Sequence, residues 1–150
     1  MKVVIQRVSK ASVLVKGKVV GQIKFGLLIF LGVSSEDNID DIHWLTNKIS
    51  NLRIFNNKEG IMNLSIKDNK GEVLVISQFT LYAKTKRGNR PSYIKAAKPK
   101  LAILLYSEFI KILKQNLGRE IQTGVFGANM KVNLVNDGPV TLIIDSKNRQ

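Results

Sequence analysis

Cysteine is absent from this 150-residue sequence, and histidine and tryptophan each occur once. Without cysteine the chain has no disulfides, no cysteine-ligated zinc site and no thiol nucleophile. The single histidine, His43, lies on a predicted helix with no second histidine to accompany it, so we interpret it as a surface or boundary residue. The Ser-His-Asp and Cys-His arrangements and the metal hydrolase clusters are thereby excluded, and we expect neither a metal nor a cofactor.

Long hydrophobic runs are also missing. The longest, Phe25 to Val33, is interrupted by Gly26 and Gly32 and is too short to cross a bilayer. The N-terminus lacks the charged-then-apolar pattern of a signal peptide. We therefore expect a soluble, cytoplasmic protein with one domain over residues 1–150, a length that suffices for a core without metal or disulfide support.

Acidic residues are scarce: 11 Asp and Glu oppose 24 Lys and Arg, which gives a formal net charge of +13. Such an excess favours polyanions, above all nucleic acid, with a membrane surface as the competing explanation. Neither predicted helix has the basic and aromatic faces of an interfacial helix. The segment Lys84 to Lys100 holds seven of the cations and no acid. It is either a solvated face or a phosphate-binding loop, and we favour the loop.

Short apolar runs separated by turn residues predict a mainly antiparallel sheet. Four of them near the N-terminus suggest a meander with short turns: Val3–Val8, Ser12–Val15, Val19–Ile23 and Leu27–Leu31. Further strands are expected at Ile61–Ile66, Ile121–Phe126, Met130–Leu134 and Val140–Ile144.

Two main helices complete the predicted α+β fold. The first begins at a capping-box pattern, Ser34 to Asp37, and its apolar stripe continues to about Ser50. The second begins at Pro99, which suits a first helical turn, and ends at Gly118.

The stretch from Val73 to Tyr82 is the most unusual of the predicted strands. Val73–Ile76 indicates a strand buried on both faces. Strand alternation then predicts that Ser77 and Phe79 point one way, and Gln78 and Thr80 the other. These polar groups either satisfy neighbouring backbone or form a site. If the chain is an enzyme, its catalytic groups are hydroxyls, an amide and backbone N–H groups, which suit the cleavage of an already activated ester.

Two other features leave alternatives open. Arg7 interrupts an apolar strand, so its charge either reaches solvent from a strand face or is held by a specific acceptor. Asn136-Asp137-Gly138-Pro139 interrupts the last predicted strand, because proline donates no ladder hydrogen bond. This segment is either an ordinary turn or one with a cis X-Pro bond.

Four segments carry a resemblance that spans the chain in order: Met1–Val8, Ser77–Tyr82, Arg90–Ser92 and Asn136–Thr141. Together they resemble the D-aminoacyl-tRNA deacylases of the widespread bacterial and eukaryotic type. The resemblance implies a homodimer with a β-barrel-like mixed fold. It also implies hydrolysis of the ester that joins a D-amino acid, or glycine mischarged on tRNA(Ala), to the 3′-terminal adenosine of tRNA.

The resemblance also assigns catalytic-site residues. It implies that Ser77 and Gln78 shape the site, that the backbone of Phe79 and Thr80 meets the substrate, and that Phe79 contacts the terminal adenosine. Thr80 is the one side chain available as a nucleophile, and the alternative is assistance by the 2′-hydroxyl of the tRNA. Because no base adjoins Thr80 in the sequence, we favour the second.

Substrate selection is implied for residues elsewhere in the chain. Gly138 and Pro139, joined by a cis bond, reach into the partner subunit's site and exclude L side chains by steric clash, while Arg7 holds them in place. From the charge of the segment Lys84 to Lys100 we assign tRNA binding to Lys84, Lys86, Arg87 and Arg90.

Two alternatives from other classes remain open. A non-catalytic RNA-binding module is suggested by charge alone, but only Phe79 and Tyr82 approximate the alternating aromatics of a base-stacking strand. A structural interaction protein requires the Gly138-Pro139 turn to be ordinary, with a trans bond.

Overall fold

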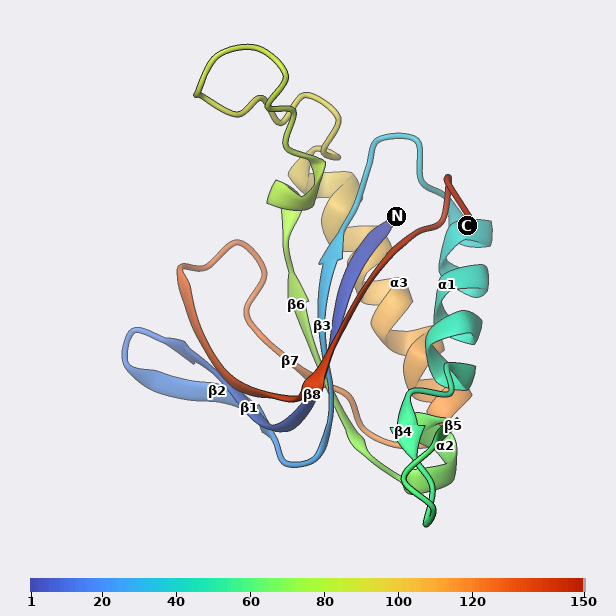
Figure 1. Ribbon diagram of the computed structural model, residues 1–150. Helices are drawn as coiled ribbons and strands as arrows, with labels where there is room; N and C mark the ends of the chain where they lie inside the picture. The colour runs from blue at the N-terminus through green and yellow to red at the C-terminus, as the bar shows by residue number, and fades with distance from the viewer. Residues whose placement is uncertain (150) are drawn as a thin grey trace.

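The long strand β1 (Lys2–Val15) organises the sheet of the computed structural model, which describes residues 1–149 (Figure 1). One half of β1 pairs with β3, the other half with β2, and β8 pairs along both. The sheet order is β2-β1-β3-β6-β7 with β8 beside β1. Its other strands are β2 (Lys18–Ile23), β3 (Gly26–Gly32), β6 (Glu72–Ser77), β7 (Gln122–Thr123) and β8 (Met130–Asp145). The sheet curls so that β2 also contacts β6 and β7, which gives the α+β fold its barrel-like form.

Strand β6 is buried on both faces, as its continuous apolar run predicts. It pairs in parallel with β3 and β7, whereas the other pairs of this sheet are antiparallel. Val73 and Val75 face the helices, and Leu74 and Ile76 join a second core inside the curled half of the sheet. A parallel strand enclosed in this way needs apolar residues at every position.

Helices α1 (Ile39–Asn51) and α3 (Pro99–Leu117) pack together against one face of the sheet (Figure 1). The second predicted helix is confirmed at both ends, with Pro99 in the first turn and Gly118 as a left-handed cap. The capping box predicted at Ser34–Asp37 is wrong, because Asn38 and Asp41 form it. The Asp37 carboxylate is buried instead against the Met1 amino group, 2.5 Å away, and the Ser34 N–H, at 2.7 Å.

Several predicted strand boundaries are wrong. The turn expected between Val8 and Ser12 is absent: β1 continues through Ser9 and Lys10, since neither residue forces a turn and β8 supplies a partner strand. The predicted meander order also fails, because β1 lies between β2 and β3.

The strand expected at Ile61–Ile66 shortens to β5 (Met62–Leu64), which pairs with β4 (Phe55–Asn56). The Ser65 side chain then caps the short helix α2 (Ile66–Asn69), so the local hydrogen bonds favour a helix over the strand. Only β7 remains of the strand expected at Ile121–Phe126.

Within residues 1–149, no helix combines the length and the apolar character that a membrane crossing requires.

Candidate active site

Strand β6 ends at Ser77, and the chain then tightens into the 3-10 turn η1 (Phe79–Tyr82). The Gln78 N–H still donates to the Leu31 carbonyl on β3, at 2.8 Å, so the strand pairing ends there. The alternation predicted for Ser77–Thr80 is therefore wrong, because residues of a 3-10 turn do not alternate between two faces. We call Ser77–Thr80 the site floor.

The side chains of the site floor contain no acid–base pair. The Gln78 amide nitrogen donates to the Thr80 hydroxyl, both being half-buried. Among the described residues no carboxylate or imidazole hydrogen-bonds the Thr80 hydroxyl, and no three acidic or histidine side chains cluster as metal ligands. The hydroxyl thus has no partner that would raise its nucleophilicity.

The backbone of the site floor offers two free donors. The hydrogen bonds of the turn begin with the Leu81 N–H, which donates to the Gln78 carbonyl at 3.3 Å. The N–H groups of Phe79 and Thr80 precede it, and neither meets an acceptor in residues 1–149. Two adjacent free N–H groups at a strand end can bind an oxyanion.

A small cavity of about 50 Å³ lies against the site floor. Its lining is otherwise apolar apart from Tyr106, whose hydroxyl donates to the Val75 carbonyl at 2.9 Å. Burial raises the pKa of Tyr106, so this phenol stays neutral and serves as a donor rather than a base. No sequence pattern marks the lining residues outside the floor, which belong to helix, strand and loop segments: Leu31, Val33, Ala97, Ala102, Tyr106 and Phe126.

A second polar feature interrupts β8. Gln6 of β1 pairs with Thr141, whereas Val8 pairs with Asn136, so residues 137–140 leave the ladder opposite Arg7. The predicted interruption of pairing is confirmed, and the Gly138-Pro139 peptide bond is cis. We call Asn136–Val140 the Gly-Pro turn.

Arg7 is buried, with only 6% of its surface exposed, and specific acceptors hold its guanidinium. Its Nε donates to the Asp137 carbonyl at 3.2 Å and forms an ion pair with the Asp137 carboxylate, at 3.1 Å. Its Nη1 donates to the Ile54 carbonyl at 2.8 Å and the Asn56 side-chain oxygen at 3.4 Å. Arg7 therefore links the Gly-Pro turn to the segment at β4.

Gly138 is the position of the turn that leaves least room for a side chain. Its φ is +122°, and a Cβ there would lie 2.7 Å from Arg7 Nη2 and 3.0 Å from Val140 Cγ2. Glycine is therefore required by both the backbone conformation and the neighbouring guanidinium.

Asn136 closes the base of the turn, a role that sequence reasoning missed. Its amide nitrogen donates to the carbonyls of Arg7 and Val140, at 3.3 and 3.1 Å, and to the Thr141 hydroxyl at 3.4 Å. Its side chain thus joins both ends of the turn to β1.

Within one chain the site floor and the Gly-Pro turn lie at opposite ends of β3. Arg7 pairs with Leu27, and Ser77 pairs with Leu31. Four residues of strand span about 13 Å. The Gly-Pro turn therefore does not line the floor of its own chain.

The basic loop, Lys84–Ser92, projects from the end of the molecule at which β6 ends (Figure 1). Its predicted tRNA-binding residues are all exposed: Lys84, Lys86, Arg87 and Arg90. Lys84 and Ser92 close the loop with two backbone hydrogen bonds, of 2.8 and 3.0 Å.

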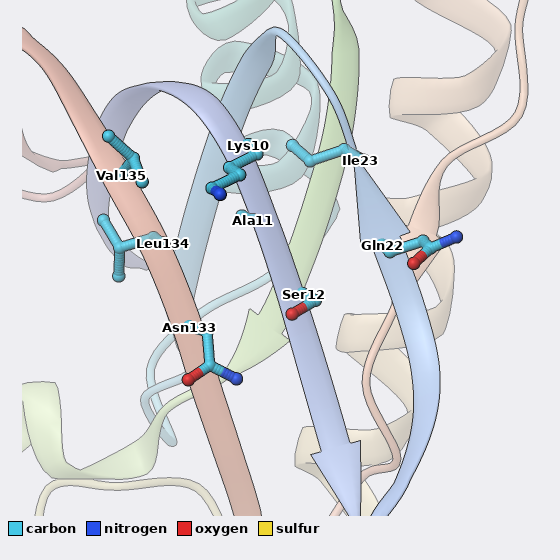
Figure 2. A pocket seen from close by; sticks show the side chains of 8 residues that line it. All are labelled: Lys10, Ala11, Ser12, Gln22, Ile23, Asn133, Leu134 and Val135. Carbon is cyan, nitrogen blue, oxygen red and sulfur yellow. The ribbon is translucent and has the colours of Figure 1, made fainter.

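A larger cavity, of about 450 Å³, lies where β1, β2 and β8 meet and shares no residue with the site floor (Figure 2). Lys10 is the one ionisable side chain in its lining, beside Ser12, Gln22 and Asn133. Like the floor, this cavity has no acid–base pair, and it lies apart from the free N–H groups of Phe79 and Thr80, so it is the weaker candidate.

Two solved structures share this barrel-like α+β fold. One, titled "c-Myc DNA Unwinding Element Binding Protein", has a TM-score of 0.91 and 37% identity, with 97% of this chain and 98% of that chain covered. The other, a probable eukaryotic D-amino acid tRNA deacylase, has a TM-score of 0.82 at 17% identity, with 95% and 97% covered, and is similar in fold.

Sequence comparison narrows the fold class to one family. A family model described as D-Tyr-tRNA(Tyr) deacylase matches residues 4–145. Proteins named D-aminoacyl-tRNA deacylase from Flavobacterium psychrophilum and Bacteroides thetaiotaomicron are 61% and 56% identical to this chain, over 100% of both chains. The chain belongs to the D-Tyr-tRNA(Tyr) deacylase family.

Proposed function

We propose that this protein hydrolyses the ester bond of D-aminoacyl-tRNA and releases the free D-amino acid and tRNA. The observation that carries the proposal is the site floor within a chain of this family. It presents two free N–H groups, a hydroxyl and an amide, without an acid–base pair. Such a site suits an ester, whose carbonyl is already more reactive than that of an amide.

In the proposed mechanism, catalysis comes mainly from backbone N–H groups of the site floor. The N–H groups of Phe79 and Thr80 bind the oxyanion that develops on the ester carbonyl. Ser77 and Gln78 shape the site around it, and Phe79 contacts the terminal adenosine. A water molecule attacks the ester carbonyl with assistance from the neighbouring ribose 2′-hydroxyl, because the Thr80 hydroxyl has no base to take its proton. The bond from the carbonyl carbon to the ribose 3′-oxygen then breaks, and that oxygen takes up the proton that the water loses.

We further propose that the site is completed in a homodimer. Gly138 and Pro139 of one subunit enter the partner's site and occupy the space that an L side chain needs. The separation of about 13 Å along β3 supports an action across subunits, because the turn is remote from its own floor. Discrimination by clash rejects L side chains and leaves glycine, which has none, as a substrate, including glycine mischarged on tRNA(Ala).

The exposed cations of the basic loop are proposed to bind the tRNA backbone, and the reaction to need no cofactor. The net charge of +13 supports this assignment, as does the absence of acids from residues 84–100. We propose a cytoplasmic location, in keeping with charged tRNA as the substrate.

The test is release of D-tyrosine and L-tyrosine from separately charged tRNA by the purified protein. We expect D-tyrosine release to exceed the spontaneous rate and L-tyrosine release to match it. No D-tyrosine release at micromolar enzyme contradicts the proposal. Tight tRNA binding without hydrolysis would favour the second candidate, a non-catalytic RNA-binding module, which the net charge of the chain also supports.

A further inference from the structure

Tyr93 lies at the foot of the basic loop on backbone that is fixed at both sides. The hydrogen bonds between Lys84 and Ser92 close the loop immediately before it. After it, the Ala96 N–H donates to the Tyr93 carbonyl at 2.9 Å. The Ala97 N–H donates to the carbonyl of Val33, the residue after β3, also at 2.9 Å. The position of Tyr93 is thus set by the fold, although the segment has no helix or strand.

The Tyr93 ring packs against Phe79 of the site floor. The ring centroids are 5.0 Å apart, and the ring planes meet at 74°. Yet both rings are open to solvent, with 37% of Tyr93 and 57% of Phe79 exposed. Ile94, the residue after Tyr93 in the chain, is 80% exposed. Large apolar side chains that gather on fixed backbone without being buried mark a contact surface.

The surroundings of the pair specify its partner. Residues 84–100 carry seven Lys and Arg and no Asp or Glu. Aromatic faces within such a cationic surface fit single-stranded nucleic acid, whose bases stack on the rings while its phosphates meet the cations.

We propose that Tyr93 stacks with the penultimate nucleotide of tRNA, next to the adenosine that Phe79 contacts. This rests on the proposed function, which places the terminal adenosine at Phe79. Because the two rings are nearly perpendicular, two successive bases cannot lie flat on both rings and also on each other. The strand therefore turns between its last two nucleotides, which separates the terminal adenosine from the stack and presents its ester to the site floor.

The experiment compares D-tyrosyl-tRNA with D-tyrosyl-adenosine, which has no penultimate nucleotide. For Tyr93→Ala we expect KM for the tRNA substrate to rise roughly tenfold, the size of a lost base–aromatic stack, with kcat little changed. The same variant should hydrolyse D-tyrosyl-adenosine as the unaltered protein does. Tyr93→Phe keeps the ring and should restore the KM for tRNA.

Ile94→Ala is the matched control, because Ile94 is the more exposed neighbour and has no ring. Its KM should stay within about twofold, since stacking needs a π-face. If Tyr93→Ala weakens the hydrolysis of D-tyrosyl-tRNA and D-tyrosyl-adenosine equally, the proposal is overturned, and Tyr93 only supports the Phe79 ring. An unchanged KM for tRNA would overturn it as well.

Failure of the proposed function is read separately, from the unaltered protein alone. If it hydrolyses neither substrate, the deacylase proposal fails. The Tyr93 proposal is then decided by affinity for uncharged tRNA with and without its last two nucleotides. The Tyr93 proposal is supported if Tyr93→Ala lowers the affinity for intact tRNA but not for the shortened tRNA. It is contradicted if the variant and the unaltered protein bind intact tRNA with equal affinity.

Discussion

The site floor and the Gly-Pro turn are both polar departures from apolar strands, but different groups hold them in place. The floor is fixed by backbone hydrogen bonds, such as that from the Gln78 N–H to Leu31. The Gly-Pro turn is fixed by side chains, since Arg7 holds it from β1 and Asn136 closes its base. A site that works through its backbone tolerates side-chain changes, whereas a steric filter depends on the side chains that position it.

The largest effect is expected from placing a side chain at Gly138. Gly138→Ala adds a Cβ 2.7 Å from Arg7 Nη2 at a φ of +122°. Backbone strain and the clash together cost about 3 kcal/mol. We expect the turn to shift and D-tyrosyl-tRNA and glycyl-tRNA hydrolysis to fall by roughly a hundredfold. Initial rates on both substrates measure this effect.

Gly60→Ala controls for backbone strain alone. Gly60 also has a positive φ, +79°, but a Cβ there meets nothing within 4 Å. This variant should lose stability to denaturant and keep its hydrolysis rates. Unchanged rates for Gly138→Ala would show that the Gly-Pro turn lies outside the functional site.

A smaller effect is expected from a substitution at Asn136 that loosens the Gly-Pro turn without filling it. Asn136→Asp keeps the shape of the side chain and removes the donor to Arg7, Val140 and Thr141. Each lost hydrogen bond costs about 1 kcal/mol, and the carboxylate now faces carbonyl oxygens. We expect L-tyrosine release to rise about tenfold above the spontaneous rate, while D-tyrosine release changes less.

Asn133→Asp is the matched control, because it makes the same change of charge on β8, at an exposed residue with no part in the turn. It should leave L-tyrosine release at the spontaneous rate. If Asn136→Asp lowers D- and L-tyrosine release in equal proportion, the hydrogen bonds of Asn136 contribute to stability and not to selectivity.

Sequence reasoning succeeded where one local rule decides the structure. The buried strand at Val73–Ile76 follows from an unbroken apolar run, and the helix from Pro99 to Gly118 from a proline and a glycine at its ends. The interruption of β8 follows from the proline that donates no hydrogen bond.

Other predictions failed because partners distant in the sequence compete with the local pattern. Ser9 and Lys10 stay extended because β8 pairs beside them, and Asp37 leaves the helix cap for the amino group of Met1. Contacts across the fold also set the hydrogen bond from Asn136 to Arg7 and the placement of Tyr93 beside Phe79. No pattern within a few residues predicts such contacts, although Arg7 within an apolar strand signalled an acceptor to be found.

The smallest effect is expected at Thr80, where a substitution tests whether the site floor acts through its backbone. Thr80→Ala removes the hydroxyl that accepts the Gln78 amide hydrogen bond, a loss of about 1 kcal/mol or roughly fivefold in rate. The N–H groups of Phe79 and Thr80 survive the substitution, so most of the D-tyrosyl-tRNA hydrolysis should survive with them. By contrast, D-tyrosyl-tRNA that ends in 2′-deoxyadenosine should be hydrolysed far more slowly by the unaltered protein. If Thr80→Ala instead loses several orders of magnitude, with fold and tRNA binding intact, and Thr80→Ser regains them, the threonine is the nucleophile and the floor acts through a side chain after all.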